Sequence, residues 1–232
     1  MRIYDTQRSG NAWKVRLFAS LRGIELERIT LSIDRGDLKQ ASFLAKSPLA
    51  QVPVLELDDG RLISESFAIL FYLAQGSPWW PADAFAQAQV LTWLSFEQAL
   101  HMRPIAQRRL HLGLRRDKGE NDADMKACKA EALEALRLLD KRLGDQGAHR
   151  WVATAGHPSI ADIALYPYTR MAPLGGLALD GFPHILAWLE KIEALPGYQP
   201  LFPGRPDLNL STRELQLRQP TAPIRPRTSG SQ

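Results

Sequence analysis

Residues 51–74 read QVPVLELDDGRLISESFAILFYLA, and this stretch decides the fold. Two short apolar runs, 52–57 and 61–63, flank the tight turn Asp58-Asp59-Gly60, which is typical of a β-hairpin. The apolar residues that follow recur at helical spacing, so we expect a helix over 65–74 with Ser64 as its cap. The stretch therefore predicts two antiparallel strands and a helix.

The residues before this hairpin predict a βαβ unit. A short apolar segment at 2–5 is followed by a helical pattern at 11–22 and by an alternating segment at 27–33. Gly23 stands where a helix C-terminal glycine belongs. With the hairpin, the order becomes β-α-β-(α)-β-β-α, which we assign to an α/β domain over residues 1–76.

The composition changes after this domain to Gly, Ser, Pro and Trp, which is typical of an interdomain linker. We place the linker at 77–84 and an all-α, helical-bundle domain at 85–204. Its helical patterns cover 84–114, 124–143, 159–172 and 183–194, and no strand pattern interrupts them. Residues 205–232 are rich in Pro, Arg, Ser and Thr, and we expect this tail to be partly disordered.

Composition predicts a globular protein that does not span a membrane. The chain has 232 residues, of which 45% are hydrophobic, and this is enough for a sizeable core. No run of about 18 uncharged apolar residues occurs, and charges at Arg2 and Asp5 leave no room for a signal sequence. The single cysteine, Cys128, forms no intramolecular disulfide, so we expect a cytoplasmic protein.

Charge and motif patterns argue against nucleic acids and metals. The net charge of +4 depends on several arginines in the tail, and the basic cluster at 108–116 lacks interleaved aromatic residues. The five histidines show no HExxH spacing, and one cysteine cannot build a zinc site. No GxGxxG, Walker or GxSxG motif is present. We therefore expect no nucleic-acid partner and no metal.

Pro53 stands at the start of an apolar strand pattern, where a proline removes a ladder donor. It has two readings. A cis bond between Val52 and Pro53 would leave the Val52 N–H and C=O free to pair with an extended peptide ligand. A proline on an edge strand would explain the same pattern without a ligand.

Glu65 and Ser66 follow the hairpin at the predicted start of a helix. Helix N-terminal amides and the Ser66 hydroxyl can hold a carboxylate, and Glu65 can accept from an ammonium group. An α-amino acid end would match this pair. Plain helix capping is the alternative, and the neighbouring Gln51-Val52-Pro53 favours the ligand.

Ser9 and Asn11 lie in a polar loop that leads into the first helix. Free N–H groups and the helix dipole favour anions there, including a thiolate, and both side chains can donate to a sulfur. N-capping by either residue explains the loop equally well.

A further motif, Ser159-Ile160-Ala161-Asp162, has a serine followed three residues later by an acid at the head of an apolar helix. This is a capping box in acidic form. We assign Ser159 and Asp162 to structure, and we expect a change at Asp162 to harm folding more than binding.

Three of these elements, in this order, resemble the glutathione transferase superfamily over about residues 1–204. Pro81, Trp93 and the capping box also look like the helical domain of that family. The three elements are Ser9-Gly10-Asn11 before Lys14-Val15-Arg16-Leu17, Gln51-Val52-Pro53-Val54-Leu55, and Ser64-Glu65-Ser66 before Ala68-Ile69-Leu70-Phe71-Tyr72-Leu73.

The resemblance implies a thioredoxin-like first domain that binds glutathione as co-substrate. Val52, next to Pro53, would pair with the cysteinyl part, and Glu65 and Ser66 would hold the γ-glutamyl end. Lys39 and Gln51 are the candidates for the glycyl carboxylate and neighbouring amides.

Family members activate the glutathione thiol with Tyr, Ser or Cys near the first helix. Ser9 stands there in this chain, with Asn11 beside it, whereas Tyr4 lies within the first strand. The resemblance thus implies Ser9 and Asn11 as catalytic residues.

The implied activity is attack of the activated thiol on a small hydrophobic electrophile, by a homodimer. A glutathione-dependent disulfide or peroxide reductase and a non-catalytic binding protein remain as alternatives. The electrophile would lie against the helical domain, in a pocket formed by Trp13, His101, Met102, Arg103, Ile105 and Arg109.

Overall fold

The computed structural model describes residues 1–147 and 151–201. The predicted tail at 205–232 lies outside the described residues. The described elements are β1 (Arg2–Asp5), α1 (Gly10–Leu21), β2 (Glu27–Thr30), η1 (Asp37–Lys39), α2 (Ala41–Leu44), β3 (Val54–Glu56), β4 (Leu62–Ser64), α3 (Ser66–Ala74), α4 (Ala84–Phe96), η2 (Glu97–His101), α5 (Met102–Arg108), η3 (Arg109–Arg115), α6 (Ala123–Gln146), α7 (Ile160–Met171), η4 (Ala172–Gly175) and α8 (Pro183–Glu193).

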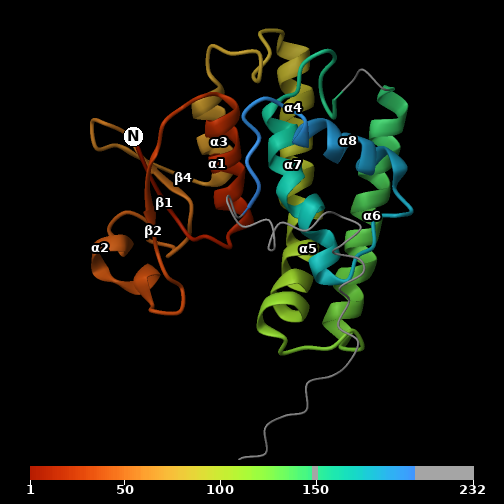
Figure 1. Cartoon of the computed structure of the whole chain (residues 1–232), viewed down its shortest axis with the longest axis horizontal. Helices are drawn as coiled ribbons and strands as arrows, with labels where there is room; N and C mark the ends of the chain where they lie inside the picture. The colour runs from red at the N-terminus through yellow and green to blue at the C-terminus, as the bar shows by residue number, and fades with distance from the viewer. Residues whose placement is uncertain (148–150, 202–232) are drawn as a thin grey trace, which may run out of the picture.

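The N-terminal domain holds a four-stranded sheet in the order β2-β1-β3-β4. Strands β1 and β2 are parallel, as a βαβ unit requires, while β1–β3 and β3–β4 are antiparallel. Helices α1 and α3 lie between this sheet and the helical domain, and α2 lies on the outer side (Figure 1). The expected thioredoxin-like domain followed by a helical domain is confirmed.

Several predicted boundaries move for local reasons. Strand β3 begins only at Val54, because Pro53 has no N–H to donate to a ladder. Strand β2 ends at Thr30 rather than at residue 33. The prediction that Ser64 caps α3 is wrong: Ser64 ends β4, and Glu65 takes the N-cap position without a side-chain cap bond.

The long helix predicted over 84–114 is one continuous rod with two π-helical turns, η2 and η3. A π-turn inserts an extra residue per turn and often marks a functional site. Here each π segment begins with a buried charged residue, Glu97 in η2 and Arg109 in η3.

The core runs without a break from one domain into the other. Helices α1 and α3 both contact α7, the central helix of the helical domain (Figure 1). Trp13 and Leu17 of α1 pack in the same apolar cluster as Tyr166 and Trp188 of the helical domain. The N-terminus of α1 is therefore held against α7 by apolar burial on both sides.

At its N-terminus, α7 has the capping box expected from the sequence. The carboxylate of Asp162 accepts from the Ser159 backbone N–H at 2.9 Å and from its hydroxyl at 3.1 Å. Its other oxygen accepts from the Val152 N–H and the Trp188 indole N–H, each at 3.0 Å. Burial raises the Asp162 pKa, and these hydrogen bonds oppose the rise.

Candidate functional site

A groove of about 300 Å³ lies where the N-termini of α1 and α3 meet the loop before β3. It gathers residues that are far apart in the sequence, from α1 to α3. The lining residues are Asn11, Ser47, Pro48, Leu49, Gln51, Val52, Pro53, Ser64, Glu65 and Ser66.

The Val52-Pro53 bond is cis, as one of the two sequence readings requires. Within the part of the chain that the structure describes, no backbone hydrogen bond involves the Val52 N–H or C=O. Both groups belong to a groove residue, so they are available to an extended ligand that pairs as an added strand.

The backbone is unusual on both sides of this groove. Ala50, just before Gln51, has φ of 53°, and Glu65 has φ of 69°. Non-glycine residues with positive φ are strained, and such residues concentrate at functional sites. Ser47 fixes the first of these turns, because its hydroxyl donates to the Gln51 C=O and accepts from the Gln51 N–H. The sequence analysis missed Ser47, although the Ser-Pro pair at 47–48 marks a turn.

Ser66 and Glu65 occupy opposite environments at the start of α3. Ser66 is buried at 3% exposure and Glu65 is exposed. Glu65 gives no side-chain cap to α3, so the first amides of that helix face the groove without a cap. An anion is favoured beside Ser66, and a cation is favoured beside the Glu65 carboxylate.

Of the two interpretations of Ser9, the structure shows N-capping. Ser9 is the N-cap of α1, and its Oγ accepts from the Ala12 N–H at 3.1 Å. The hydroxyl hydrogen remains available to donate. The groove lining includes Asn11 but not Ser9. Tyr4 is engaged elsewhere, since its hydroxyl donates to Glu56 at 2.6 Å.

Lys39 is the one predicted glutathione-site residue that the groove lining does not include. It is exposed at the end of η1. Gln51, Val52, Pro53, Glu65 and Ser66 are brought together as the sequence predicted.

Three of the predicted second-substrate residues are buried in the described structure. Trp13, His101 and Ile105 are at most 3% exposed, and Trp13 and Ile105 belong to the apolar core of the helical domain. These three placements correct the prediction, because residues at helical spacing along an apolar face pack inward. Met102 is partly buried against that core, and Arg103 is exposed.

Arg109 reaches the N-terminal domain instead. Its Nη2 donates to the Arg8 C=O at 3.0 Å, and the side chain is only 7% exposed in total. Arg8 directly precedes Ser9, so a residue predicted to orient the electrophile contacts the loop that carries the candidate thiol-binding group.

A buried ion pair joins the domains one turn further along α1. Lys14 Nζ lies 2.7 Å from Glu97 Oε1, and both side chains are fully buried. Burial lowers the Lys14 pKa, while the charges of Glu97 and of the groove residue Glu65 oppose this. The sequence could not reveal this pair, because its members are 83 positions apart.

Buried polar atoms without a partner gather around the same place. In the described residues these atoms are Asp5 Oδ1, Thr6 Oγ1, Asn11 Oδ1, His101 Nδ1 and Arg109 Nε. Asp5 ends β1, Thr6 follows it and Asn11 lies in the first turn of α1. Arg109 contacts Arg8 in the same part of the chain, and the His101 ring experiences the Lys14 charge. Unsatisfied buried polar groups are rare and point to a functional role.

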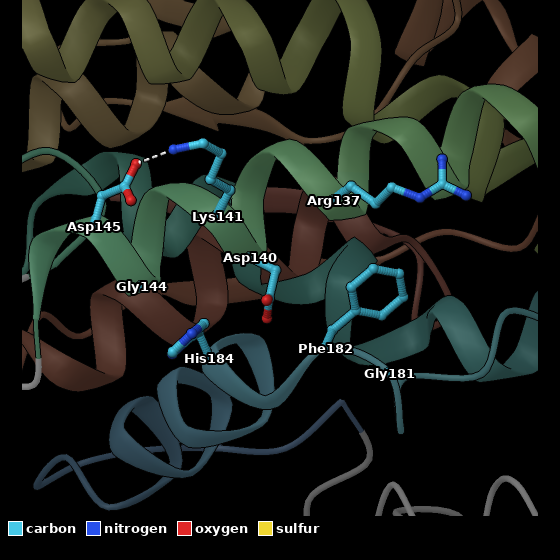
Figure 2. Close-up of a pocket in the computed structure, with 8 residues that line it drawn as sticks. All are labelled: Arg137, Asp140, Lys141, Gly144, Asp145, Gly181, Phe182 and His184. Atoms are coloured by element: carbon cyan, nitrogen blue, oxygen red, sulfur yellow. Dashed lines mark hydrogen bonds and ion pairs between the residues drawn. The ribbon is translucent and has the colours of Figure 1, made fainter.

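A second cavity, of about 330 Å³, lies between α6 and the start of α8. Figure 2 shows its charged side chains, with Lys141 paired to Asp145 on α6 and Asp140 directed at α8. Asp140 already accepts from the Ile185 N–H at 2.9 Å, which caps α8. These contacts stabilise the surface of the helical domain, and the groove at α1 is the better candidate site.

The described residues contain no cluster of three or more His, Cys, Asp or Glu that could hold a metal ion. Among the described helices, none has the length and apolar character to cross a bilayer.

The fold is a thioredoxin-like domain joined to a helical domain, and the chain belongs to the glutathione S-transferase superfamily. The family model of the glutathione S-transferase N-terminal domain matches residues 8–75. The model of the C-terminal domain matches residues 95–196.

Individual relatives agree with this assignment. A crystal structure of a glutathione S-transferase from Pseudomonas fluorescens is 36% identical, with a TM-score of 0.82 over 87% of this chain and 98% of that one. A maleylacetoacetate isomerase from Pseudomonas aeruginosa is 26% identical over 89% of this chain and 98% of its own length. Ure2p in complex with glutathione is 23% identical with a TM-score of 0.76 over 84% of this chain and 90% of that one, a likeness of fold alone.

Proposed function

We propose that this chain binds glutathione in the groove and activates its thiol for attack on a small hydrophobic electrophile. One observation carries the proposal: the groove holds the unpartnered Val52 backbone groups together with the Asn11 side chain at the N-terminus of α1. The Val52 groups pair with the cysteinyl part, and the Asn11 amide lies at the N-terminus of α1, where the thiol sulfur would follow.

The ends of the tripeptide fit the rest of the groove. The buried Ser66 hydroxyl and the first amides of α3 hold the γ-glutamyl carboxylate, and Glu65 holds its ammonium group. Gln51, fixed by Ser47, donates toward the glycyl end.

Activation consists of lowering the thiol pKa. The Asn11 side-chain amide donates to the sulfur when its NH₂ faces the groove, and the Ser9 hydroxyl donates its remaining hydrogen. The α1 N-terminus adds its positive dipole end. Each pKa unit of thiol depression corresponds to about 1.4 kcal/mol, the size of one hydrogen bond to a charged group.

The test is the pKa of the bound glutathione thiol, followed by the ultraviolet absorbance of the thiolate. Asn11→Ala and Ser9→Ala are each expected to raise this pKa by about one unit. Ser20→Ala, at the far end of the same helix, is the control and keeps the wild-type value. If both α1 N-terminal variants match the control, neither residue activates the thiol.

A second candidate function is glutathione-dependent isomerisation, favoured by the full-length match to the Pseudomonas aeruginosa maleylacetoacetate isomerase. A thiolate that adds to a double bond conjugated with a carbonyl permits rotation, and elimination then restores the thiolate. The activated thiol serves both reactions.

Consumption of glutathione separates the candidates. Transfer to 1-chloro-2,4-dinitrobenzene consumes one glutathione per product, isomerisation of maleylacetoacetate consumes none, and reduction of a mixed disulfide produces oxidised glutathione. We expect transfer to be the fastest of the three. Glutathione binding in a calorimeter without turnover of any of them would instead indicate a binding protein.

We also propose a homodimer, in which a second copy covers the exposed apolar side chains of α3 and α4. Phe71 of α3 and Leu91 of α4 are 43% and 53% exposed, and Phe67 and Phe85 accompany them. Sedimentation is expected to give twice the chain mass, and Phe71→Glu is expected to give monomers. The single cysteine, Cys128, suits the cytoplasmic location that we propose for this enzyme.

A further inference from the structure

The helical domain contacts the segment 8–11, which leads into α1 and includes its N-cap and first two residues, at three adjacent points. Arg109 donates to the Arg8 C=O at 3.0 Å. Tyr168 and Met171 of α7 pack directly against Gly10. The Asn11 backbone N–H donates a hydrogen bond to the Tyr168 hydroxyl oxygen. Ser9 and Asn11, the proposed thiol-binding residues, therefore lie within a segment whose position the other domain sets.

The backbone at Gly10 lies very close to the side chains of α7. A Cβ added to Gly10 would lie 2.8 Å from the Met171 Cε and 2.8 Å from the Tyr168 Cζ. Real Cβ atoms do not approach carbon so closely, so the backbone of the segment rests on the tyrosine ring. Glycine is needed here because of this close approach.

Arg109 is placed for its contact by the second π-turn of the long helix. It is the first residue of η3, where the extra residue per turn changes the direction of the side chains that follow the regular helix. Its Nη2 donates to the segment, and its buried Nε has no partner among the described residues. A buried guanidinium with an unsatisfied donor contributes little to stability, which argues that it is kept for another reason.

Tyr168 completes the arrangement. Burial raises the pKa of its hydroxyl to about 12, and the Arg109 charge and the Asn11 amide oppose the rise. The hydroxyl is therefore neutral, and its oxygen can accept a hydrogen bond from the Asn11 backbone N–H.

We propose that Arg109 and Tyr168 are positioning residues of the helical domain that fix the segment 8–11 for activation of the glutathione thiol. The inference rests on the proposed function, since it assumes that Ser9 and Asn11 contact the sulfur. A hydrogen bond to a thiolate weakens steeply as its distance and angle depart from the optimum, so a shift of the segment by a fraction of an ångström raises the thiol pKa.

The experiment uses Arg109→Met and Tyr168→Phe in the full chain, with Arg115→Met as the matched control. Arg115 ends η3 on the same long helix but is exposed. Tyr168→Phe keeps the ring against Gly10 and removes only the hydroxyl, so it serves if Arg109→Met folds poorly. Two quantities are measured: the pKa of the bound glutathione thiol, and the hydrogen exchange of the backbone amides at 10–13.

Arg109→Met is expected to raise the bound-thiol pKa by about one unit, which lowers the thiolate fraction about tenfold below that pKa. Tyr168→Phe is expected to act in the same direction and less strongly. Both should quicken exchange at 10–13 without changing the KM for glutathione, whereas a general loss of structure would change the KM as well. Arg115→Met should match the wild type.

If both Arg109→Met and Tyr168→Phe show wild-type hydrogen exchange and a wild-type thiol pKa, the positioning role is wrong. The proposed roles of Ser9 and Asn11 in thiol activation are not affected by that result. Quickened exchange with an unchanged thiol pKa also overturns the positioning role, because the segment then moves without consequence. If the wild-type chain fails to bind glutathione, the proposed function falls, and the positioning role falls with it.

Discussion

The two ends of helix α7 differ in whether the buried polar groups beside them have hydrogen-bond partners. At the N-terminus, both oxygens of Asp162 are occupied by four donors from three residues. Toward the C-terminus, Tyr168 and Thr169 face Asn11, Arg109 and His101, each of which keeps a buried polar atom without a partner. The Asp162 oxygens at the N-terminal end therefore have all their partners within the chain, whereas three polar atoms near the C-terminal end have none among the described residues.

This difference separates a folding device from a site. A buried polar network whose members are all satisfied specifies one structure, whereas a network with open positions costs free energy. The open end adjoins the groove that we assign to glutathione through Asn11, which lines it. Four variants, ordered from the largest expected effect to the smallest, test whether the two ends differ in this way.

Lys14→Met is expected to lower the free energy of unfolding by about 4 kcal/mol, because it leaves Glu97 as a buried charge without its partner. Urea unfolding at neutral pH measures the change. The double variant Lys14→Met, Glu97→Leu should recover most of the loss, since an apolar pair of similar volume avoids the desolvation cost. A loss below about 1 kcal/mol in the single variant would show that the pair is not isolated from water.

Asp162→Ala is expected to lower the free energy of unfolding by about 3 kcal/mol, because the Ser159, Val152 and Trp188 donors are left buried without an acceptor. The folded fraction should bind glutathione with wild-type affinity in calorimetry. Asp145→Ala, which removes an exposed partner of Lys141, is the control and should change stability by less than about 1 kcal/mol. Weaker glutathione binding with unchanged stability would assign Asp162 to the site instead.

Because of His101, the free energy of unfolding is expected to decrease at acidic pH. The Thr169 hydroxyl donates to the Leu165 C=O, so His101 Nε2 must donate to Thr169, and Nδ1 is left as an acceptor without a partner. Burial, with a smaller effect of the Lys14 charge, lowers the His101 pKa to about 3. Protonation would bury an unpaired charge beside a cation.

The folded-state pKa of His101 lies below that of the unfolded chain, which is about 6.5. The unfolded state therefore binds the proton first, and stability falls as the pH drops below about 6.5 toward 3. From about pH 7 to about pH 5 the loss from this residue is about 2 kcal/mol. Urea unfolding at both pH values should show a smaller loss for His101→Asn than for the wild type. Equal losses would mean that His101 is protonated in the folded chain.

Ser9→Ala has the smallest expected effect on stability, about 1 kcal/mol, because it removes the N-cap of α1. Asp83→Ala is the matched variant, since Asp83 caps α4 through the Ala86 N–H at 2.8 Å. Both variants should lose similar stability in urea, but only Ser9→Ala should slow glutathione transfer. Equal activity in the two would reduce Ser9 to a cap and leave thiol activation to Asn11.

Local chemistry could be predicted from sequence wherever the partners are neighbours in the chain. The hairpin around Gly60, the capping box at Ser159 and the group formed by Gln51, Val52, Glu65 and Ser66 all follow from short-range patterns. The proline at 53 also allowed the cis bond as one of two readings.

Contacts between distant segments could not be predicted in this way. Trp13, His101 and Ile105 were predicted to line the electrophile pocket, but helical periodicity could not say whether their helix faces met a cavity or a core. Arg109 was expected at the electrophile and lies instead on the Arg8 carbonyl, because a π-turn that no pattern in the sequence announces redirects it.

Sequence alone indicated the order of strands and helices and several residues of the groove, because hydrogen bonding along the chain and the period of apolar residues act over a few positions. Only the tertiary structure decided which charges are buried together and which polar atoms stay open. Lys14 meets Glu97, and Arg109 meets Arg8, only when apolar burial presses α1 against α7. The free energy of that packing comes from the whole core and cannot be predicted from any single motif.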